Sequence, residues 1–309
     1  MIFDISKTQF LLIVLQKYVF HFHQDFYCPQ FLHLPKEHIM EKAWYEGWFN
    51  SPFYHKLYFE HDDKEAKAFI HQLIEHLKPA SASKMLDVAC GKGRYSKTLA
   101  SLGFNVTGID ISPDSIAFAK QYEKEDLEFF VHDMRLPFYS NYFDYVFNFF
   151  TSFGYFKTRR EHDSAIRSIA KSLKPGGKFV IDYLNVHYAE DHLRSSEIKQ
   201  SGETTYDILR WHDATHFYKK ITVTDPSLAQ PFTCTEIVTK FSLGDFTEMF
   251  AYQGMQVQEV FGDYKLNSYD VRKTPRLIIV ADKKEQFASA SPSQEKRLYS
   301  DGRKTDALT

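Results

Sequence analysis

The chain has 309 residues, and its 38 lysines and arginines nearly balance 40 aspartates and glutamates, for a formal net charge of −2. This balance argues against a dominant surface for nucleic acid or for an anionic membrane, and 43% hydrophobic residues exclude wholesale disorder. Three scattered cysteines (Cys28, Cys90 and Cys234) favour neither a disulfide framework nor a metal cluster, and they suit a reducing, cytoplasmic setting. The 17% aromatic content suits a large core or a ring-walled pocket.

Residues 1–40 are expected to form a peripheral extension. The apolar run over residues 9–22 is interrupted by Gln16 and Lys17, and it is shorter than the roughly 20 apolar residues that a membrane-spanning helix needs. It also lacks the basic start and small-residue cleavage site of a secretory signal. Globular patterning begins at residue 41, which makes Met40 a candidate for the true start.

The following segment is first aromatic and then helical. Rings crowd residues 44–59, where they either pack in a core or close over a pocket. Apolar residues then recur at three- to four-residue spacing from Ala66 to Leu77, which predicts an amphipathic helix that ends at Pro79.

Short apolar runs next alternate with helical stretches, and the predicted strands are residues 84–89, 105–110, 128–133, 144–150 and 178–184. Strict alternation predicts βαβ units, with a parallel sheet and helices on both of its faces.

The pattern then changes within about residues 186–242. Runs over 205–213, 216–225 and 232–242 alternate partly with period two, which predicts an inserted antiparallel β meander. A helix over 243–254 and strands over 255–265 and 276–284 follow, and the Ser-rich residues 285–309 are expected to be a disordered tail.

The strongest local signal is LDVACGKGRYS, residues 86–96, where a strand enters a glycine-containing turn before a helix. Gly91 and Gly93 let the backbone approach a ligand closely, and the helix N-terminus offers unpaired N–H groups. Such a turn is also typical of simple packing between elements. Asp87 within the motif disfavours a pyrophosphate and favours a ligand that carries an ammonium or sulfonium group.

Further signals lie at the ends of the next strands. Asp110 can accept both hydroxyls of a ribose, and it is not needed as a cap because Ser112 and Pro113 supply that pair. Asp133 could receive an exocyclic amino group, and an aromatic run over 148–156 leaves the fourth strand. Open α/β sheets bind ligands at the carboxyl ends of their strands, so this convergence predicts a nucleoside-type site.

The chain resembles the class I S-adenosylmethionine-dependent methyltransferases that act on small molecules, in the order and spacing of LDVACGKGRYS, VTGIDIS, FFVHDMRLPF, FDYVFNFFTSFGYF and LKPGGKFVIDYLN. The resemblance covers residues 41–284 as one methyltransferase domain. It implies an α/β fold with a Rossmann-like, doubly wound, seven-stranded sheet and an antiparallel final strand. It also implies S-adenosyl-L-methionine as the cofactor.

The cofactor-binding residues that the resemblance implies lie at the strand ends: Tyr54, Asp87, Ala89, Cys90, Gly91, Gly93, Asp110, Ile111, Asp133, Met134 and Phe149. Asp87 and the 89–93 loop would surround the methionine part, and Asp110 would hold the ribose. The side chains at 111, 133 and 134 would meet the adenine. Phe149 would lie on the sulfur side, and Tyr54 resembles a tyrosine that some members place over the carboxylate end.

Methyl transfer from a sulfonium asks the protein mainly to align the nucleophile and exclude water. Candidate proton acceptors are His132, His187, Tyr155 and Tyr183, and the sequence singles out none of them as catalytic. The strand-4 segment NFFTSF lacks the Asn/Asp-Pro-Pro-aromatic pattern associated with base and glutamine amides, and no basic stripe indicates RNA. A small-molecule acceptor is therefore predicted, with an N, O or C nucleophile.

Other interpretations stay open at this point. A nicotinamide-dependent oxidoreductase would need a phosphate-binding loop without a carboxylate such as Asp87 beside it. A non-catalytic module of the same fold would bind the cofactor without turnover, which the intact Asp87, Gly91, Gly93 and Asp110 argue against. The inserted strands form either a cap over the acceptor or the interface of a homodimer, since exposed strands leave edges to cover.

Overall fold

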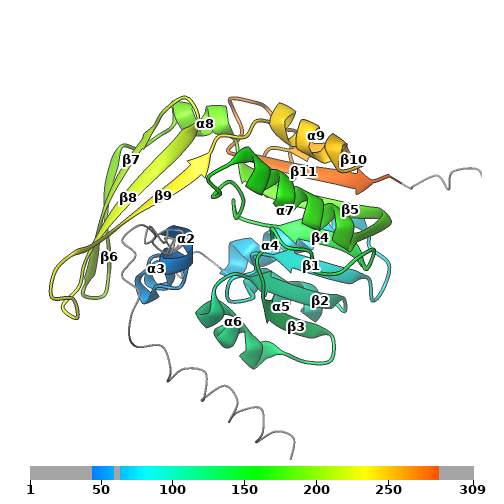
Figure 1. The fold of residues 1–309 in the computed structure, drawn as a ribbon, viewed down its shortest axis with the longest axis horizontal. Helices are drawn as coiled ribbons and strands as arrows, with labels where there is room; N and C mark the ends of the chain where they lie inside the picture. The colour runs from blue at the N-terminus through cyan, green and yellow to red at the C-terminus, as the bar shows by residue number, and fades with distance from the viewer. Residues whose placement is uncertain (1–43, 59–62, 285–309) are drawn as a thin grey trace, which may run out of the picture. The chain divides into compact units, whose positions relative to one another are not determined.

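The main sheet has seven strands in the order β10-β11-β5-β4-β1-β2-β3 (Figure 1). The computed structural model describes residues 44–58 and 63–284, so the expectations for residues 1–40 and 285–309 lie outside the described residues. The strands are β1 (Lys84–Val88), β2 (Asn105–Asp110), β3 (Leu127–Val131), β4 (Phe143–Asn148), β5 (Leu173–Leu184), β10 (Met255–Phe261) and β11 (Arg276–Lys283). Strands β1 to β5 run parallel, whereas β11 is antiparallel to both β5 and β10. The predicted seven-stranded sheet with an antiparallel final strand is confirmed.

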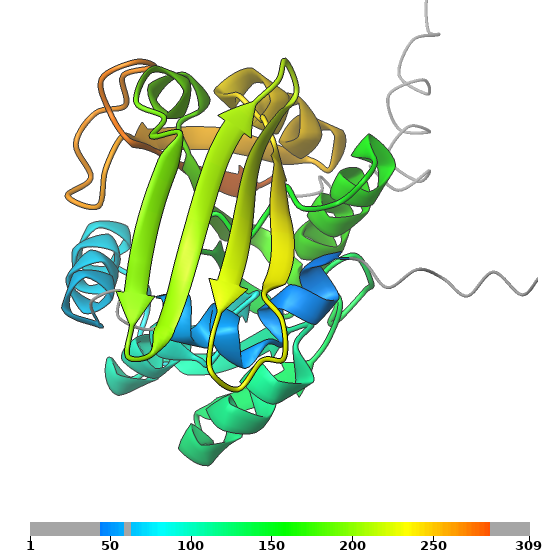
Figure 2. The same cartoon turned by 90° about the vertical axis from the view of Figure 1, so that its left-hand side faces the viewer.

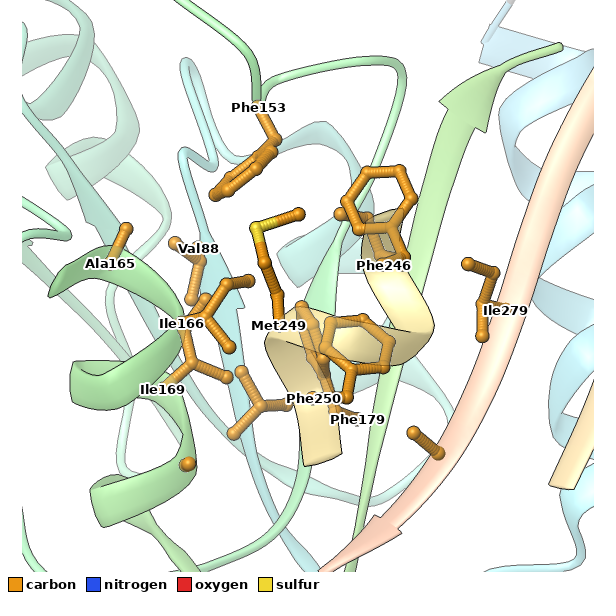
Figure 3. Close-up of a cluster of buried hydrophobic side chains, with 14 of the residues drawn as sticks. Val88, Phe153, Ala165, Ile166, Ile169, Phe179, Phe246, Met249, Phe250 and Ile279 are labelled. Carbon is orange, nitrogen blue, oxygen red and sulfur yellow. The ribbon is translucent and has the colours of Figure 1, made fainter. Parts of the chain in front are cut away.

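Helices cover both faces of this sheet, as the doubly wound prediction requires. One face carries α4 (Asp63–Leu77), α5 (Arg94–Ser101), α6 (Pro113–Ala119) and η1 (Lys120–Tyr122), and the other carries α7 (Arg159–Ser172) and α9 (Leu243–Tyr252). Along β5, Phe179 and Ile181 belong to one buried core and Val180 to the other, as the alternation of a strand demands. Figure 3 shows the first core, in which Met249 and Phe250 of α9 lie beside Phe179. No helix among the described residues is long and apolar enough to span a membrane.

The insertion is a second sheet of four antiparallel strands, not the three-stranded meander that the sequence predicts. After α8 (Val186–Asp191), its strands are β6 (Ser196–Ser201), β7 (Thr204–His212), β8 (His216–Thr224) and β9 (Phe232–Thr239). The missed strand, β6, is polar (SEIKQS) and lies at the edge of the sheet, where Ile198 is exposed. Its period-two pattern therefore carries no apolar signal.

The aromatic stretch before α4 folds as two short helices, α2 (Trp44–Phe49) and α3 (Pro52–Tyr58), which pack against the four-stranded sheet. Figure 2 shows the sheet in front of these helices. Trp48 and Leu57 share a third buried core with Ile208 and Ile221 of the sheet. This packing places the inner face of the second sheet over the strand ends of the first.

Several predicted strand ends are wrong by a few residues. Backbone geometry explains the end of the fourth strand. The fourth strand ends at Asn148 and not at 150, because Phe150 and Thr151 have φ angles of 57° and 56°. Residues in that left-handed region cannot continue a strand. The third strand likewise ends at Val131, which leaves His132 and Asp133 in the loop beyond it.

Candidate active site

A cavity of about 360 Å³ lies at the carboxyl ends of β1, β2 and β4, beneath the second sheet. Rings make up much of its wall: Tyr45, Phe49, Tyr54, Tyr58, Phe150, Tyr155 and Phe156. Four of these rings come from α2 and α3, so the aromatic stretch lines the cavity as well as filling the third core.

The turn after β1 has the left-handed backbone that its glycines permit. Ala89, Gly91 and Gly93 have φ angles of 60°, 55° and 76°. A Cβ added at Gly93 would lie 2.6 Å from the ring of Phe129, whereas one at Gly91 would meet nothing within 4 Å. Ala89 and Gly91 line the cavity, so Gly93 serves packing while Gly91 presents backbone to open space.

Asp110 lines the cavity at the end of β2 and fixes the turn at the same time. Its Oδ2 accepts a hydrogen bond from the Gly91 N–H at 2.8 Å, and its Oδ1 accepts one from the Ser112 N–H at 2.8 Å. Burial raises the pKa of this carboxyl, and the backbone N–H groups of Ser112, Gly91 and Ile111 oppose that rise. Each oxygen keeps a second lone pair, so Asp110 can also accept ligand hydroxyls. Ile111 lines the wall beside it.

Asp87 lies behind the turn, and it lines neither this cavity nor the smaller one described below. Its side chain is 1% exposed, and its Oδ2 accepts a hydrogen bond from the Ser96 hydroxyl at 2.6 Å. Burial raises the pKa of Asp87 to about 7, the Ser96 hydroxyl lowers it, and the nearby Asp110 carboxylate raises it further. The carboxyl therefore holds the first turn of α5 in place and acts on the cavity only through the turn.

Asp133 and Met134 line the cavity beyond β3, where the Asp133 carboxylate is already engaged. It accepts hydrogen bonds from the Arg135 side chain at 2.7–3.1 Å, and Arg135 also donates to Glu161 at 2.7 Å. The sequence interpretation missed Arg135. Its hydrogen bonds occupy lone pairs of Asp133 and so limit how many further donors that carboxylate can accept. His132 lines the same wall, and its Nε2 lies 3.2 Å from the Leu136 carbonyl.

A second cavity of about 170 Å³ adjoins the first, since both are lined by Tyr54, Gly91 and Phe150. Phe149 and Cys90 line this smaller space together with Lys92 and Arg94. It is thus the more cationic of the two spaces. Phe150 lines both cavities, whereas Phe149 lines only the smaller of these two.

The loop after β4 is held in its left-handed conformation by a buried ion pair. Asp182 accepts hydrogen bonds at its Oδ2 from the Phe150 N–H (2.8 Å) and at its carbonyl from the Thr151 N–H (2.9 Å). Arg276 donates to Asp182 at 2.7 Å and to the Thr151 hydroxyl at 3.0 Å. Asp182 is fully buried, so this pair fixes the loop that forms one wall of the cavity.

Glu236 of β9 lines the cavity from the opposite side, and the sequence interpretation missed it. Its Oε1 accepts hydrogen bonds from the Trp48 Nε1–H at 2.7 Å and from the Tyr58 hydroxyl at 2.8 Å. Lys219 on the adjacent strand places its Nζ 3.7 Å from Oε2. The only sequence signal for Glu236 was its position in the run over 232–242, which alternates partly with period two.

Two phenols on the wall stay protonated at neutral pH. Burial raises the pKa of Tyr54, and the carboxylates of Glu236 and Asp110 raise it further, so Tyr54 lies between the two acidic walls. Burial and Glu236 also raise the pKa of Tyr155, whose hydroxyl donates to the Thr151 carbonyl at 2.7 Å. These groups act as donors and not as bases.

The other candidate proton acceptors lie apart from the cavity. Tyr183 is fully buried and its hydroxyl donates to the Thr239 carbonyl, while His187 lies beside Glu190 at 3.3 Å. Neither residue lines either cavity. In the described part of the chain, no group of three or more His, Cys, Asp or Glu side chains could hold a metal ion.

Comparisons with known proteins indicate the family. A family model described as a methyltransferase domain matches residues 86–181. The dTDP-3-amino-3,4,6-trideoxy-alpha-D-glucopyranose N,N-dimethyltransferase of Streptomyces venezuelae is 27% identical over 187 residues, which is 59% of this chain and 78% of that protein. Glycine N-methyltransferase of Oryctolagus cuniculus is 26% identical over 230 residues, covering 62% of this chain and 77% of that one.

A solved structure shares the fold. The amino pentose methyltransferase CalS10 from Micromonospora echinaspora, solved with S-adenosylmethionine bound, superposes with a TM-score of 0.58 at 21% identity. The match covers 76% of this chain and 98% of that one. At this identity the likeness shows the fold alone.

Proposed function

The chain belongs to the class I S-adenosylmethionine-dependent methyltransferases, and from this premise we propose that it methylates a small molecule held between the strand ends and the four-stranded sheet. One observation carries the proposal: a single ring-lined cavity has Asp110 of β2 on one wall and Glu236 of β9 on the other. The first wall suits a nucleoside and the second belongs to the insertion. Relatives that act on an amino sugar and on glycine support an acceptor of small size.

The residues present fit the cofactor. Asp110 keeps spare lone pairs for ribose hydroxyls, and Gly91 leaves open space beside it. Lys92 and Arg94 in the adjoining smaller cavity suit a carboxylate, and the rings of the larger cavity suit a sulfonium by cation–π attraction. When bound, S-adenosylmethionine supplies an electrophilic methyl group. We assign to its binding the residues implied above, with Asp87 and Gly93 acting through the turn and not by contact.

The chain's own part in the reaction is to orient the acceptor and keep water out. Tyr54, Tyr58 and Tyr155 enclose the space between the two walls with neutral, apolar ring surfaces. Enclosure raises the share of productive orientations and protects the donor from hydrolysis. The inner face of the second sheet packs on α2 and α3, which favours a cap over the acceptor rather than a homodimer interface.

The alternatives are separable. Family membership sets aside the nicotinamide-dependent oxidoreductase, and a non-catalytic module would bind S-adenosylmethionine but release no S-adenosylhomocysteine with any acceptor. Turnover with a panel of small nucleophiles therefore tests the proposed activity directly.

The cofactor assignment is tested by Asp110→Ala, with Asp126→Ala as control because the half-buried Asp126 lies outside both cavities and its carboxylate pairs with Lys124 at 3.0 Å. Loss of charge-assisted hydrogen bonds to the ribose costs about 1.5–3 kcal/mol, or roughly 10- to 150-fold in affinity. Calorimetric titration with S-adenosylmethionine measures the change, and thermal unfolding checks that the variant is folded. Unchanged affinity in a folded Asp110→Ala protein would remove Asp110 from the site.

A further inference from the structure

The four-stranded sheet presents the carboxylate of Glu236 to the cavity. Its side chain is 12% exposed, and it lies on the inner face of β9, directly across from Lys219 of β8. The loop after β4, with Phe150 and Thr151, lines the same space. Glu236 thus lies where the sheet meets the acceptor and away from the strand ends assigned to the cofactor.

The contacts of Glu236 show how its two oxygens differ. Oε1 is bound by two donors, the Trp48 Nε1–H and the Tyr58 hydroxyl, at 2.7 and 2.8 Å. Oε2 has longer contacts, 3.1 Å to the same hydroxyl and 3.7 Å to Lys219 Nζ. All of these partners are donors, as an ionised carboxylate requires. Oε2 therefore keeps the greater capacity for a donor that enters the cavity.

The geometry points to an amine acceptor whose nitrogen binds Glu236 and gives it a proton; this inference rests on the proposed function. A carboxylate accepts hydrogen bonds only, and a cationic donor forms the strongest of them. The surrounding rings of Tyr54, Tyr58 and Tyr155 stabilise an ammonium before transfer and a methylated ammonium after it. A carboxylate is too weak a base to deprotonate an alcohol. An ammonium is much closer in acidity to a carboxylic acid, so the carboxylate can take a proton from it.

The step balances in protons and electrons. The ammonium nitrogen gives one proton to the Glu236 carboxylate and keeps the electron pair of that N–H bond. This pair forms the C–N bond to the methyl carbon as the C–S bond breaks, and the sulfur keeps the electrons of the C–S bond as a neutral thioether. The product leaves as a methylated ammonium, and Glu236 returns its proton to water.

The experiment compares matched probes on the full chain saturated with S-adenosylhomocysteine. The probes are glycine with glycolate, glucosamine with glucose, and ethanolamine with ethylene glycol, which differ by an amine in place of a hydroxyl. By calorimetry, at least one amine should bind roughly ten-fold or more tightly than its hydroxyl partner. Glu236→Gln should abolish that preference while S-adenosylhomocysteine affinity changes less than about two-fold.

Glu197→Gln is the control, because it also removes a glutamate from this sheet, where Glu197 pairs with Arg210 at 2.6 Å outside the cavity. It should keep the amine preference. If Glu236→Gln does not fold, Glu236→Asp replaces it, and this variant should keep the preference at reduced affinity because the charge remains.

A product experiment adds a second arm. S-adenosylmethionine with a deuterated methyl group is incubated with the enzyme and a polar metabolite extract, and mass spectrometry locates the label, which should lie on nitrogen. Equal binding of amines and hydroxyl partners, no binding of any amine, an unchanged preference in folded Glu236→Gln, or label on oxygen, sulfur or carbon would each overturn the inference. Failure of S-adenosylhomocysteine to bind the wild type would instead count against the proposed function.

Discussion

The buried ion pair behind the loop after β4 gives the sharpest test of the structure. Asp182→Asn removes the charge that compensates Arg276, whose side chain is 17% exposed while Asp182 is fully buried. Breaking such a pair on one side costs about 3–5 kcal/mol, because the remaining charge stays buried without its partner. The same change also weakens the acceptor for the Phe150 N–H, so the left-handed loop loses one of its restraints.

The same two strands supply the matched control. Lys178 and Asp282 also pair across β5 and β11, at 2.7 Å, but their side chains are 30% and 34% exposed. Asp282→Asn should therefore cost no more than about 1 kcal/mol. Urea unfolding of the full chain measures the free energy of unfolding of each variant. Equal losses in the two variants, or a loss below about 1 kcal/mol for Asp182→Asn, would refute the reasoning.

Three further expectations concern stability. Gly93→Ala should lower the free energy of unfolding more than Gly91→Ala, because both force a left-handed alanine but only the former meets an aromatic ring; urea unfolding giving the reverse order would contradict this. Phe217→Ala, in the buried inner layer, should cost about 3 kcal/mol, and Tyr218→Ala, on the outer face, about 1 kcal/mol or less, as thermal unfolding of each would show. The raised pKa of Asp87 means that the folded state keeps a proton that the unfolded state loses above its ordinary value of 3.8, so stability falls from about pH 4 to about pH 7. Asp87→Asn should lack that fall, and an identical pH dependence in both proteins would contradict the buried protonated carboxyl.

The sheet could be predicted because its signals are local. Apolar runs alternate with helical periodicity from β1 to β5, and Asp110 and Gly91 stand at strand ends where parallel sheets bind ligands. The two residues meet through a hydrogen bond of 2.8 Å. The positions of these two residues at strand ends were therefore enough to predict that they lie close together.

The other wall could not be predicted because its contacts are distant. Trp48 and Glu236 are 188 positions apart, and their hydrogen bond depends on how α2 packs beneath β9. Arg135 also bonds Glu161, 26 positions away, and Asp182 bonds Arg276, 94 positions away, and the sequence pattern shows neither contact. The polar strand β6 likewise exists because β7 pairs with it, not because its own sequence favours burial.

The two walls are held by different parts of the fold. The turn after β1 is held by close packing at Gly93 and by the hydrogen bonds that Asp110 accepts. The second sheet rests on its own core, in which Trp48 packs against Ile208 and Ile221. Glu236, which lines the cavity from β9, is tied to that core by the hydrogen bond from Trp48. We therefore propose that acceptor preference is set in the insertion, through Glu236, and cofactor binding in the main sheet.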